Sequence, residues 1–334
     1  MIITKTPFRM SFFGGGTDIE EYFREYGGAV LSTTFDKYCY VTVRHLPRFF
    51  DYTTELAYSK MERVKDVDEI QHPAVRNAMK MLDMHEIRLT YEADLPARSG
   101  LGTSSSFAVG MLNAFYALKG KYADKKTLAD EAIYLERELC QEAGGWQDQI
   151  AASFGGMNRI EFNRDGTYDV RPIIIHPERK QQLNDNLLMF FTGFTRFSSE
   201  VQKVNQADYG GKIKQLQQLY LLVDEAQAIL EDKYSNLDIF GHLLDKTWKL
   251  KRQTSGAITT NSINDLYEKG IKAGALGGKL LGAGGGGFLV FYVRTENKES
   301  VLDAMKDLLH VPFRFEDSGT QVIHYTPEMY EPKE

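Results

Sequence analysis

The sequence predicts an α+β fold arranged as two units. First, a chain of 334 residues is longer than one typical domain of roughly 100–200 residues, so two domains are expected. Second, each half combines strand-like segments with helix-like segments that are apolar on one side, which is typical of helices laid on one face of an antiparallel sheet. Polar turns give way to a buried strand-like run near 180–186, so we place the units at 1–183 and 184–334.

The first unit is predicted to open on two long strands separated by a short helix. Partly alternating β-branched and aromatic side chains favour strands at 1–14 and 28–46, and Gly27-Gly28 ends a helix that begins at Ile19. The apolar pattern then predicts a strand at 87–91 and helices at 72–82, 107–118 and 124–142, and polar turns with strand pieces fill 157–185.

The second unit is predicted to open on a buried strand, 187–191. Helices follow at 212–232, 235–253 and 264–273, and a glycine-rich hairpin at 277–293 comes next. A helix near 298–309 and two short strands near 312–325 complete the unit.

The composition excludes some classes of partner. A net charge of −6 and an isoelectric point near 5.8 do not attract nucleic acid or an anionic membrane, so any phosphate binding must be local. No segment approaches the ~20 apolar residues of a membrane span, and the N-terminus lacks the apolar stretch of a signal peptide. Cys39 and Cys140 are too few for a disulfide framework or a zinc site, so we expect a reduced, cytoplasmic protein.

The stretch Ser99–Ser106 is the most informative one in the chain. A glycine-rich turn runs directly into a helix-like apolar segment that starts at Phe107, after the strand at 87–91. The first N–H groups of a helix lack partners and the helix dipole favours an anion, so this layout predicts a phosphate-binding loop. A polar helix cap with surplus serines is the alternative interpretation. The stretch is not a Walker A sequence, because no Lys-Ser or Lys-Thr follows it.

The stretch Gly282–Gly287 matches the letters of a dinucleotide fingerprint but not its context. A strand-like run, Phe288–Val293, follows it, whereas the fingerprint requires a helix there. Five glycines in six residues also exceed what a hairpin turn needs. We therefore expect another backbone or a ligand to pack closely against this loop.

Four charged positions stand out in the first unit. Arg9 lies in an apolar strand, where a cation is costly unless it meets an anion. Asp18 follows Gly14-Gly15-Gly16-Thr17, and the pattern alone favours a helix-capping role for it. Glu136 interrupts the apolar row of the 124–142 helix, and Asp148 follows that helix in an expected turn beside Trp146. Each carboxylate is a candidate base or a salt-bridge partner.

Together these stretches resemble the GHMP kinases over nearly the whole chain. Pro7–Asp18 resembles the first motif of the family, Pro96–Phe107 the second, with Thr103 in place of a serine, and Lys279–Gly287 the third. The resemblance implies a ribosomal-S5-domain-2-like N-terminal domain that holds the phosphate loop. It also implies a ferredoxin-like helix-on-sheet C-terminal domain that holds the glycine-rich hairpin, which packs against the phosphate site in the family.

Within the family, Gly144–Gln149 resembles a segment of the heptose kinase and fucokinase branches. The Gly14–Asp18 run, with Gly27–Val30 and Asp36–Tyr38, is more similar to the heptose branch. This similarity implies ATP-dependent phosphorylation of the anomeric hydroxyl of D-glycero-D-manno-heptose 7-phosphate. The alternatives are another sugar 1-kinase, such as an L-fucokinase, and a non-catalytic sugar sensor on the same fold.

The resemblance also implies roles for individual residues. Asp148 and Arg9 would be catalytic, Ser104 and Glu136 would bind Mg²⁺, and ATP and a sugar phosphate would be the partners. The ATP phosphates would meet Ser99, Gly100, Leu101, Gly102, Thr103, Ser104 and Ser105. The sugar would meet Gly15, Gly16, Thr17, Asp18, Gln149, Gly284 and Gly285. The candidates for binding the 7-phosphate are Lys37, Arg44, Arg98 and Arg196.

Overall fold

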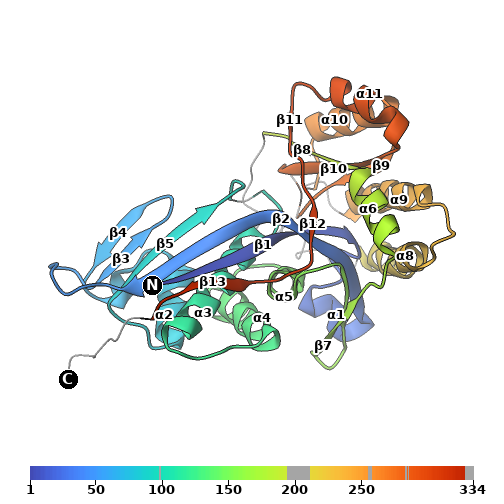
Figure 1. Ribbon diagram of the computed structural model, residues 1–334. Coiled ribbons are helices and arrows are strands. Elements are labelled where there is room, and N and C mark those ends of the chain that lie inside the picture. The colour runs from blue at the N-terminus through green and yellow to red at the C-terminus, as the bar shows by residue number, and fades with distance from the viewer. Residues whose placement is uncertain (98, 194–210, 255–257, 283, 285, 328–334) are drawn as a thin grey trace.

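The computed structural model describes residues 1–97, 99–193, 211–254, 258–282, 284 and 286–327. Within these residues the chain forms one sheet of nine strands and one sheet of four, with helices packed on both (Figure 1). This architecture confirms the α+β class.

The nine-stranded sheet is built on two long paired strands, β1 and β2. The path through the sheet is β13-β1-β2-β5-β3-β4; β6 and β12 also pair with β2, and β7 pairs with β6. All pairs are antiparallel except β3 with β5. The strands are β1 (Ile2–Phe13), β2 (Gly28–His45), β3 (Thr54–Ala57), β4 (Met61–Val64), β5 (Ile87–Ala93), β6 (Asn158–Phe162), β7 (Tyr168–Pro172), β12 (Phe315–Glu316) and β13 (Gln321–Tyr325).

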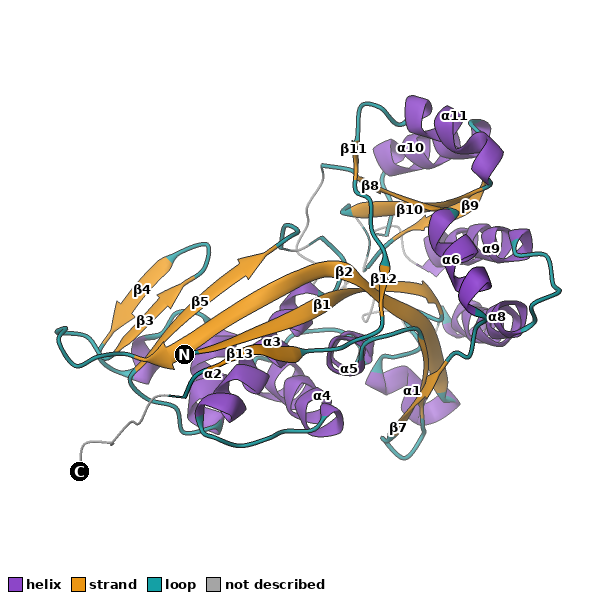
Figure 2. Ribbon diagram, in the orientation of Figure 1, coloured by secondary structure: helices purple, strands orange, loops and turns teal. Residues whose placement is uncertain are grey.

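Helices α2 to α5 lie on one face of this sheet, with α3 packed directly on β1 and β2 (Figure 2). Helix α3 is buried on nearly all sides, which explains why its sequence after Ser106 is mostly apolar all round. The helices of this half are α1 (Glu20–Tyr26), α2 (Pro73–Met81), α3 (Thr103–Leu118), α4 (Lys125–Tyr134), α5 (Gln147–Phe154) and α6 (Pro177–Asp185).

The four-stranded sheet has the order β11-β8-β10-β9 and is buried on both faces. In strand β8, Leu188 and Phe190 face a core shared with α10 and α11, while Leu187 and Met189 face the core shared with β1. Burial of both faces explains why β8 reads as a continuous apolar run. The strands are β8 (Leu187–Phe191), β9 (Ala275–Leu280), β10 (Phe288–Val293) and β11 (Leu309–His310). The helices are α8 (Ile213–Glu231), α9 (Asp238–Thr254), α10 (Asn261–Lys272) and α11 (Lys298–Ala304).

The structure corrects several predicted elements. The helix expected over 124–142 stops at Tyr134 and continues as a π-helical turn, Leu135–Leu139, closed by a bond from Cys140 N to Leu135 O of 2.9 Å. The expected turn around Asp148 is instead the first turn of α5, a helix too short to give a clear apolar period. Polar α6 replaces expected turns, because Pro177 at its start favours a helix and only Arg179 and Leu183 are buried.

The end of the chain returns to the first sheet. Strand β12 pairs with β2, and β13 pairs with β1. The predicted unit 184–334 does not anticipate this pairing, because strands as short as β12 and as exposed as β13 carry no sequence signal of their partner. The helix expected at 298–309 ends at Ala304, and Leu309–His310 forms the edge strand β11.

Two distant glycine turns meet in the interior. Gly282 follows β9 with a φ of 79°, and a Cβ atom there would lie 2.3 Å from Gly100 Cα. A Cβ atom at Gly287 would lie 2.2 Å from Ser99 O. Side chains at either position would drive the two loops apart, so the glycines set how closely the loops approach.

Substitution of Gly282 tests this contact. Gly282 and Gly120 both have positive φ, so alanine costs ~1–2 kcal/mol of backbone strain at each position. Only at Gly282 would the new methyl group also meet backbone atoms, since nothing lies within 4 Å of a Cβ at Gly120. We expect Gly282→Ala to lower the free energy of unfolding in urea by about 1–3 kcal/mol more than Gly120→Ala, the usual cost of overpacking. Equal losses in the two variants would contradict the contact.

Candidate active site

The loop Ser99–Gly102 ends at the N-terminus of α3. Gly102 is the N-cap residue, in the left-handed conformation, and no side chain caps the helix. The hydroxyls of Ser104 and Ser105 point elsewhere, so the alternative of a serine cap does not hold. The positive end of a 16-residue helix is thus left for an anion.

Glu136 forms a buried polar cluster with this helix end. Ser104 Oγ donates to Glu136 Oε1 at 2.9 Å, and Ser105 Oγ donates to Oε2 at 2.6 Å. The Gln149 side-chain amide also donates to Oε2. Glu136 is 1% exposed and lies in the π-helical turn, a feature frequent at functional sites.

The donor atoms of this cluster suit Mg²⁺. Mg²⁺ prefers a few protein oxygens supplemented by phosphate oxygens and water, and Ser104 and Glu136 supply one hydroxyl and one carboxylate. Among the described residues, no group of three or more His, Cys, Asp or Glu side chains forms an all-protein metal site. A Mg²⁺ ion held by Ser104 and Glu136 would take its other ligands from phosphate oxygens and water.

Arg9 and Asp148 form a two-point ion pair beside the phosphate loop. Arg9 Nε lies 2.6 Å from Asp148 Oδ1, and Arg9 Nη2 lies 2.8 Å from Oδ2. Arg9 Nη1 donates to Gly100 O at 2.8 Å. Arg9 is only 4% exposed, and this buried cation is matched by an anion, as its place in an apolar strand required. The pair ties β1, α5 and the loop together.

Asp18 is buried and does not cap α1, the helix that follows it. It accepts from Gly16 N at 2.9 Å and from Gln147 Nε2 at 3.0 Å, while α1 begins after Ile19 without a side-chain cap. The capping role favoured by the sequence pattern is therefore wrong. Burial raises the pKa of Asp18, and the nearby Asp148 charge adds to the increase, while hydrogen bonds from Gly16 and Gln147 oppose it.

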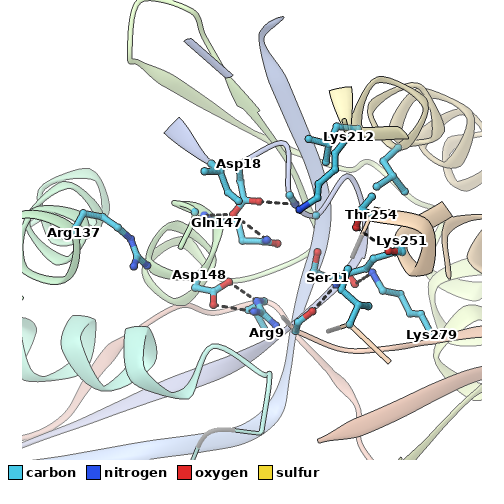
Figure 3. A pocket seen from close by; sticks show the side chains of 18 residues that line it. Arg9, Ser11, Asp18, Arg137, Gln147, Asp148, Lys212, Lys251, Thr254 and Lys279 are labelled. Carbon is cyan, nitrogen blue, oxygen red and sulfur yellow. Dashed lines mark hydrogen bonds and ion pairs between the residues drawn. The ribbon is translucent and has the colours of Figure 1, made fainter. Parts of the chain in front are cut away.

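One pocket gathers three of these groups, whereas Ser104, Ser105 and Glu136 do not line it (Figure 3). Arg9, Asp18 and Asp148 line it from the first half of the chain. From the second half come side chains of α8, α9 and β9, together with Gly282. The lining residues are Arg9, Ser11, Gly15, Gly16, Asp18, Ile19, Arg137, Gly145, Gln147, Asp148, Lys212, Leu216, Leu219, Lys251, Thr254, Ile258, Lys279 and Gly282.

Several expected sugar contacts lie outside this pocket. The Thr17 hydroxyl is buried and donates to Gly14 O and Ala29 O, which holds the turn before α1. Gln149 points to Glu136, because residues 147 and 149 lie on different sides of α5. Gly284 packs on the backbone of Ile258. Gly285 lies outside the described residues.

The expected phosphate-binding cations are also elsewhere. Lys37 donates to its neighbour Asp36 and does not line the pocket. Arg44 lies opposite Arg88 in the β2–β5 pairing, away from the pocket. Arg98 and Arg196 lie outside the described residues.

Sequence reasoning missed the lysines of the pocket. Lys279 in β9 is 2% exposed, and its Nζ donates to Ser11 O at 2.8 Å and Phe12 O at 2.9 Å. Burial and the cations Lys251 and Arg9 hold the pKa of Lys279 well below its usual value. Its place in a buried, apolar strand was a usable signal. Lys212 and Lys251 stand at helix ends, where lysines are usually solvated, so the sequence contained no signal that they line a pocket.

Comparison with known proteins identifies one family. Residues 69–156 match the N-terminal domain of the GHMP kinases, and residues 225–311 match the C-terminal domain of the GHMP kinases. The chain is 29% identical over 318 residues to the D-glycero-alpha-D-manno-heptose 7-phosphate kinase of Campylobacter jejuni, which covers 91% of this chain and 93% of that protein.

A further relative and a solved structure are also sugar kinases by name. The L-fucokinase/L-fucose-1-P guanylyltransferase of Bacteroides fragilis is 26% identical over 333 residues, covering 85% of this chain and 34% of that protein. The crystal structure of a D-glycero-D-manno-heptose 1-phosphate kinase from Bacteroides thetaiotaomicron matches with a TM-score of 0.78 at 23% identity. It covers 99% of this chain and 100% of that chain, which shows a shared fold.

No helix in the described part of the chain has the length and apolar character to cross a membrane. Both family domains match in their expected order; the first and third glycine-bearing motifs line one pocket, and the second packs against the third at Gly100 and Gly282. The chain therefore belongs to the GHMP kinase family and is a phosphotransferase that moves a phosphoryl group from ATP to an alcohol group.

Proposed function

We propose that the protein phosphorylates the C1 hydroxyl of D-glycero-D-manno-heptose 7-phosphate to give the 1,7-bisphosphate. The relatives support a sugar kinase in general, and the heptose 7-phosphate kinase of C. jejuni supports this acceptor in particular. The observation that carries the proposal is the Arg9–Asp148 ion pair, which stands in the pocket next to the phosphate loop.

Asp148 receives the acceptor hydroxyl. Each of its oxygens accepts one Arg9 N–H, so each keeps a further lone pair for a substrate O–H. As the hydroxyl oxygen bonds to the γ-phosphorus, the bond between that phosphorus and the β–γ bridging oxygen breaks, ADP leaves, and the hydroxyl proton passes toward Asp148. An anomeric hydroxyl is more acidic than an ordinary alcohol, so alignment and modest base assistance suffice.

The phosphates of ATP lie at the N-terminus of α3 in this proposal. Backbone N–H groups of Gly100–Ser105 and the helix dipole attract the β- and γ-phosphates. Ser104 and Glu136 would hold Mg²⁺, which would offset negative charge on the transferring group when bound. Gly282 packs against Gly100 and keeps the loop from widening.

The charge of the pocket favours an anionic acceptor over a neutral one. Among the described lining residues, five side chains are cationic and two are carboxylates. A phosphorylated heptose suits this balance better than L-fucose, which carries no phosphate. The paired Arg9 and Asp148, together with the Ser104–Glu136 contact, argue against a non-catalytic sugar sensor.

A substrate panel tests the proposal. We expect the purified protein with ATP and Mg²⁺ to phosphorylate D-glycero-D-manno-heptose 7-phosphate with a higher kcat/KM than L-fucose or D-galactose. Phosphorus NMR of the product should show a new phosphate on the anomeric carbon. A higher kcat/KM for L-fucose would contradict the proposed acceptor, and turnover of none of the sugars would contradict the enzyme assignment at this site.

Replacement of Asp148 tests the proton acceptor. Asp148→Asn keeps the side-chain shape but removes the charge, so we expect kcat to fall by roughly 10²–10⁴, the usual contribution of a general base. ATP binding, measured by calorimetry, should persist because Arg9 can keep its hydrogen bond to Gly100 O in the phosphate loop. Asp303→Asn, on the exposed helix α11, serves as the control. Turnover in Asp148→Asn equal to that of the control would rule out the assignment.

Replacement of Glu136 tests the metal site. Glu136→Gln removes the proposed carboxylate ligand, so the Mg²⁺ concentration for half-maximal activity should rise about tenfold or more, as for loss of one charge-assisted contact. Glu138→Gln changes an exposed neighbour in the same π-helical turn and should leave the magnesium titration unchanged. If both variants titrate like the unmodified protein, Glu136 is not a ligand.

A further inference from the structure

Two lysines from the second half of the chain stand on the pocket wall that faces Asp18. Lys212 immediately precedes α8, and Lys251 lies in the last turn of α9; both line the pocket. Figure 3 shows Lys212 and Asp18 pointing toward one another across the pocket. Neither lysine lies in the glycine-bearing motifs Pro7–Asp18, Pro96–Phe107 and Lys279–Gly287.

The other described cations of the pocket make their contacts away from α8 and α9. Arg9 gives Nε and Nη2 to Asp148 and Nη1 to Gly100 O. Lys279 is almost fully buried, and its amine donates to two carbonyl oxygens of β1. Arg137 lies beside Glu136, on the proposed metal side, and donates to Glu142 O. Lys212 and Lys251 are the two remaining cations among the described lining residues.

The surroundings of these lysines suit a phosphate group. Lys212 is the N-cap of α8, a helix of 19 residues without a side-chain cap, so the positive helix end lies at the pocket. Lys251 Nζ donates to Gly282 O, and an ammonium group has two further N–H donors. The buried Ser11 hydroxyl also lines the pocket, is 6% exposed and has no hydrogen-bond partner among the described residues.

The electrostatics agree with this geometry. Burial and the nearby Arg9 lower the pKa of Lys251 to about 8, while Asp18 and Asp148 partly oppose the decrease. A bound dianion would therefore stabilise the charged amine. Such a group placed here would be held on the opposite side of the pocket from Asp148 in Figure 3.

We propose that Lys212, Lys251 and the first turn of α8 bind the phosphate that the acceptor sugar already carries. The C7 phosphate lies at the far end of a seven-carbon sugar from the reacting C1 hydroxyl. The sugar then spans the pocket, with C1 at Asp148 and C7 at the lysines. This inference rests on the proposed function and adds the residues that read the acceptor phosphate.

Steady-state kinetics of lysine variants test the inference. We expect Lys212→Met and Lys251→Met each to raise KM for heptose 7-phosphate by about 10- to 100-fold, the effect of losing one hydrogen bond to a charged group. KM for ATP should stay unchanged, and Lys→Arg at each position should recover part of the affinity. The controls are Lys214→Met, exposed in the first turn of α8, and Lys249→Met, exposed in α9.

The outcomes separate this inference from the proposed function. The unmodified protein is measured first, with heptose 7-phosphate and with the unphosphorylated heptose. If it turns over only the unphosphorylated sugar, the proposed function fails, and the phosphate subsite with it. If it turns over the 7-phosphate but the Met variants keep its KM, the lysine subsite alone is overturned. An equal rise in KM for ATP would place the lysines at the nucleotide and also overturn the subsite.

Discussion

The ion pair between Arg9 and Asp148 is the contact on which the rest of the site depends. Its guanidinium joins three separate pieces of chain, since it binds both oxygens of Asp148 in α5 and the carbonyl oxygen of Gly100. A charge-assisted pair with two parallel hydrogen bonds fixes direction as well as distance. Because Arg9 is nearly fully buried, loss of either partner would leave the other charge without compensation.

Next to this ion pair, the two halves of the chain pack against each other through two glycine loops. Gly100 and Gly282 approach so closely that neither accepts a side chain, and Lys251 bonds to the carbonyl oxygen of Gly282. The pocket therefore draws Arg9 and Asp148 from one half and lysines from the other, and the phosphate loop lies against Arg9 and Gly282. A movement of one sheet relative to the other would change the position of the lysines relative to Arg9 and Asp148.

Much of the fold and part of the site could be predicted from the sequence. Long strands with regular patterns, such as β1 and β2, and glycine turns before a helix have strong local signals. The tertiary role of Asp18 could not be predicted, because a carboxylate before a helix usually caps it, and only the packing of α5 brings Gln147 to it. The roles proposed for Lys212 and Lys251 could not be predicted for a similar reason. They depend on how α8 and α9 are oriented, and the neighbours of these lysines in the sequence give no sign of that.

A double-mutant cycle on Arg9 and Asp148 tests the central claim most directly. Residues that act together have strongly non-additive effects. If Arg9 and Asp148 act as one unit, the double variant Arg9→Met/Asp148→Asn should therefore have a kcat/KM no lower than that of the less active single variant. Losses that multiply, so that the double variant shows the product of the two single effects, would mean that Arg9 and Asp148 act independently and would contradict the account.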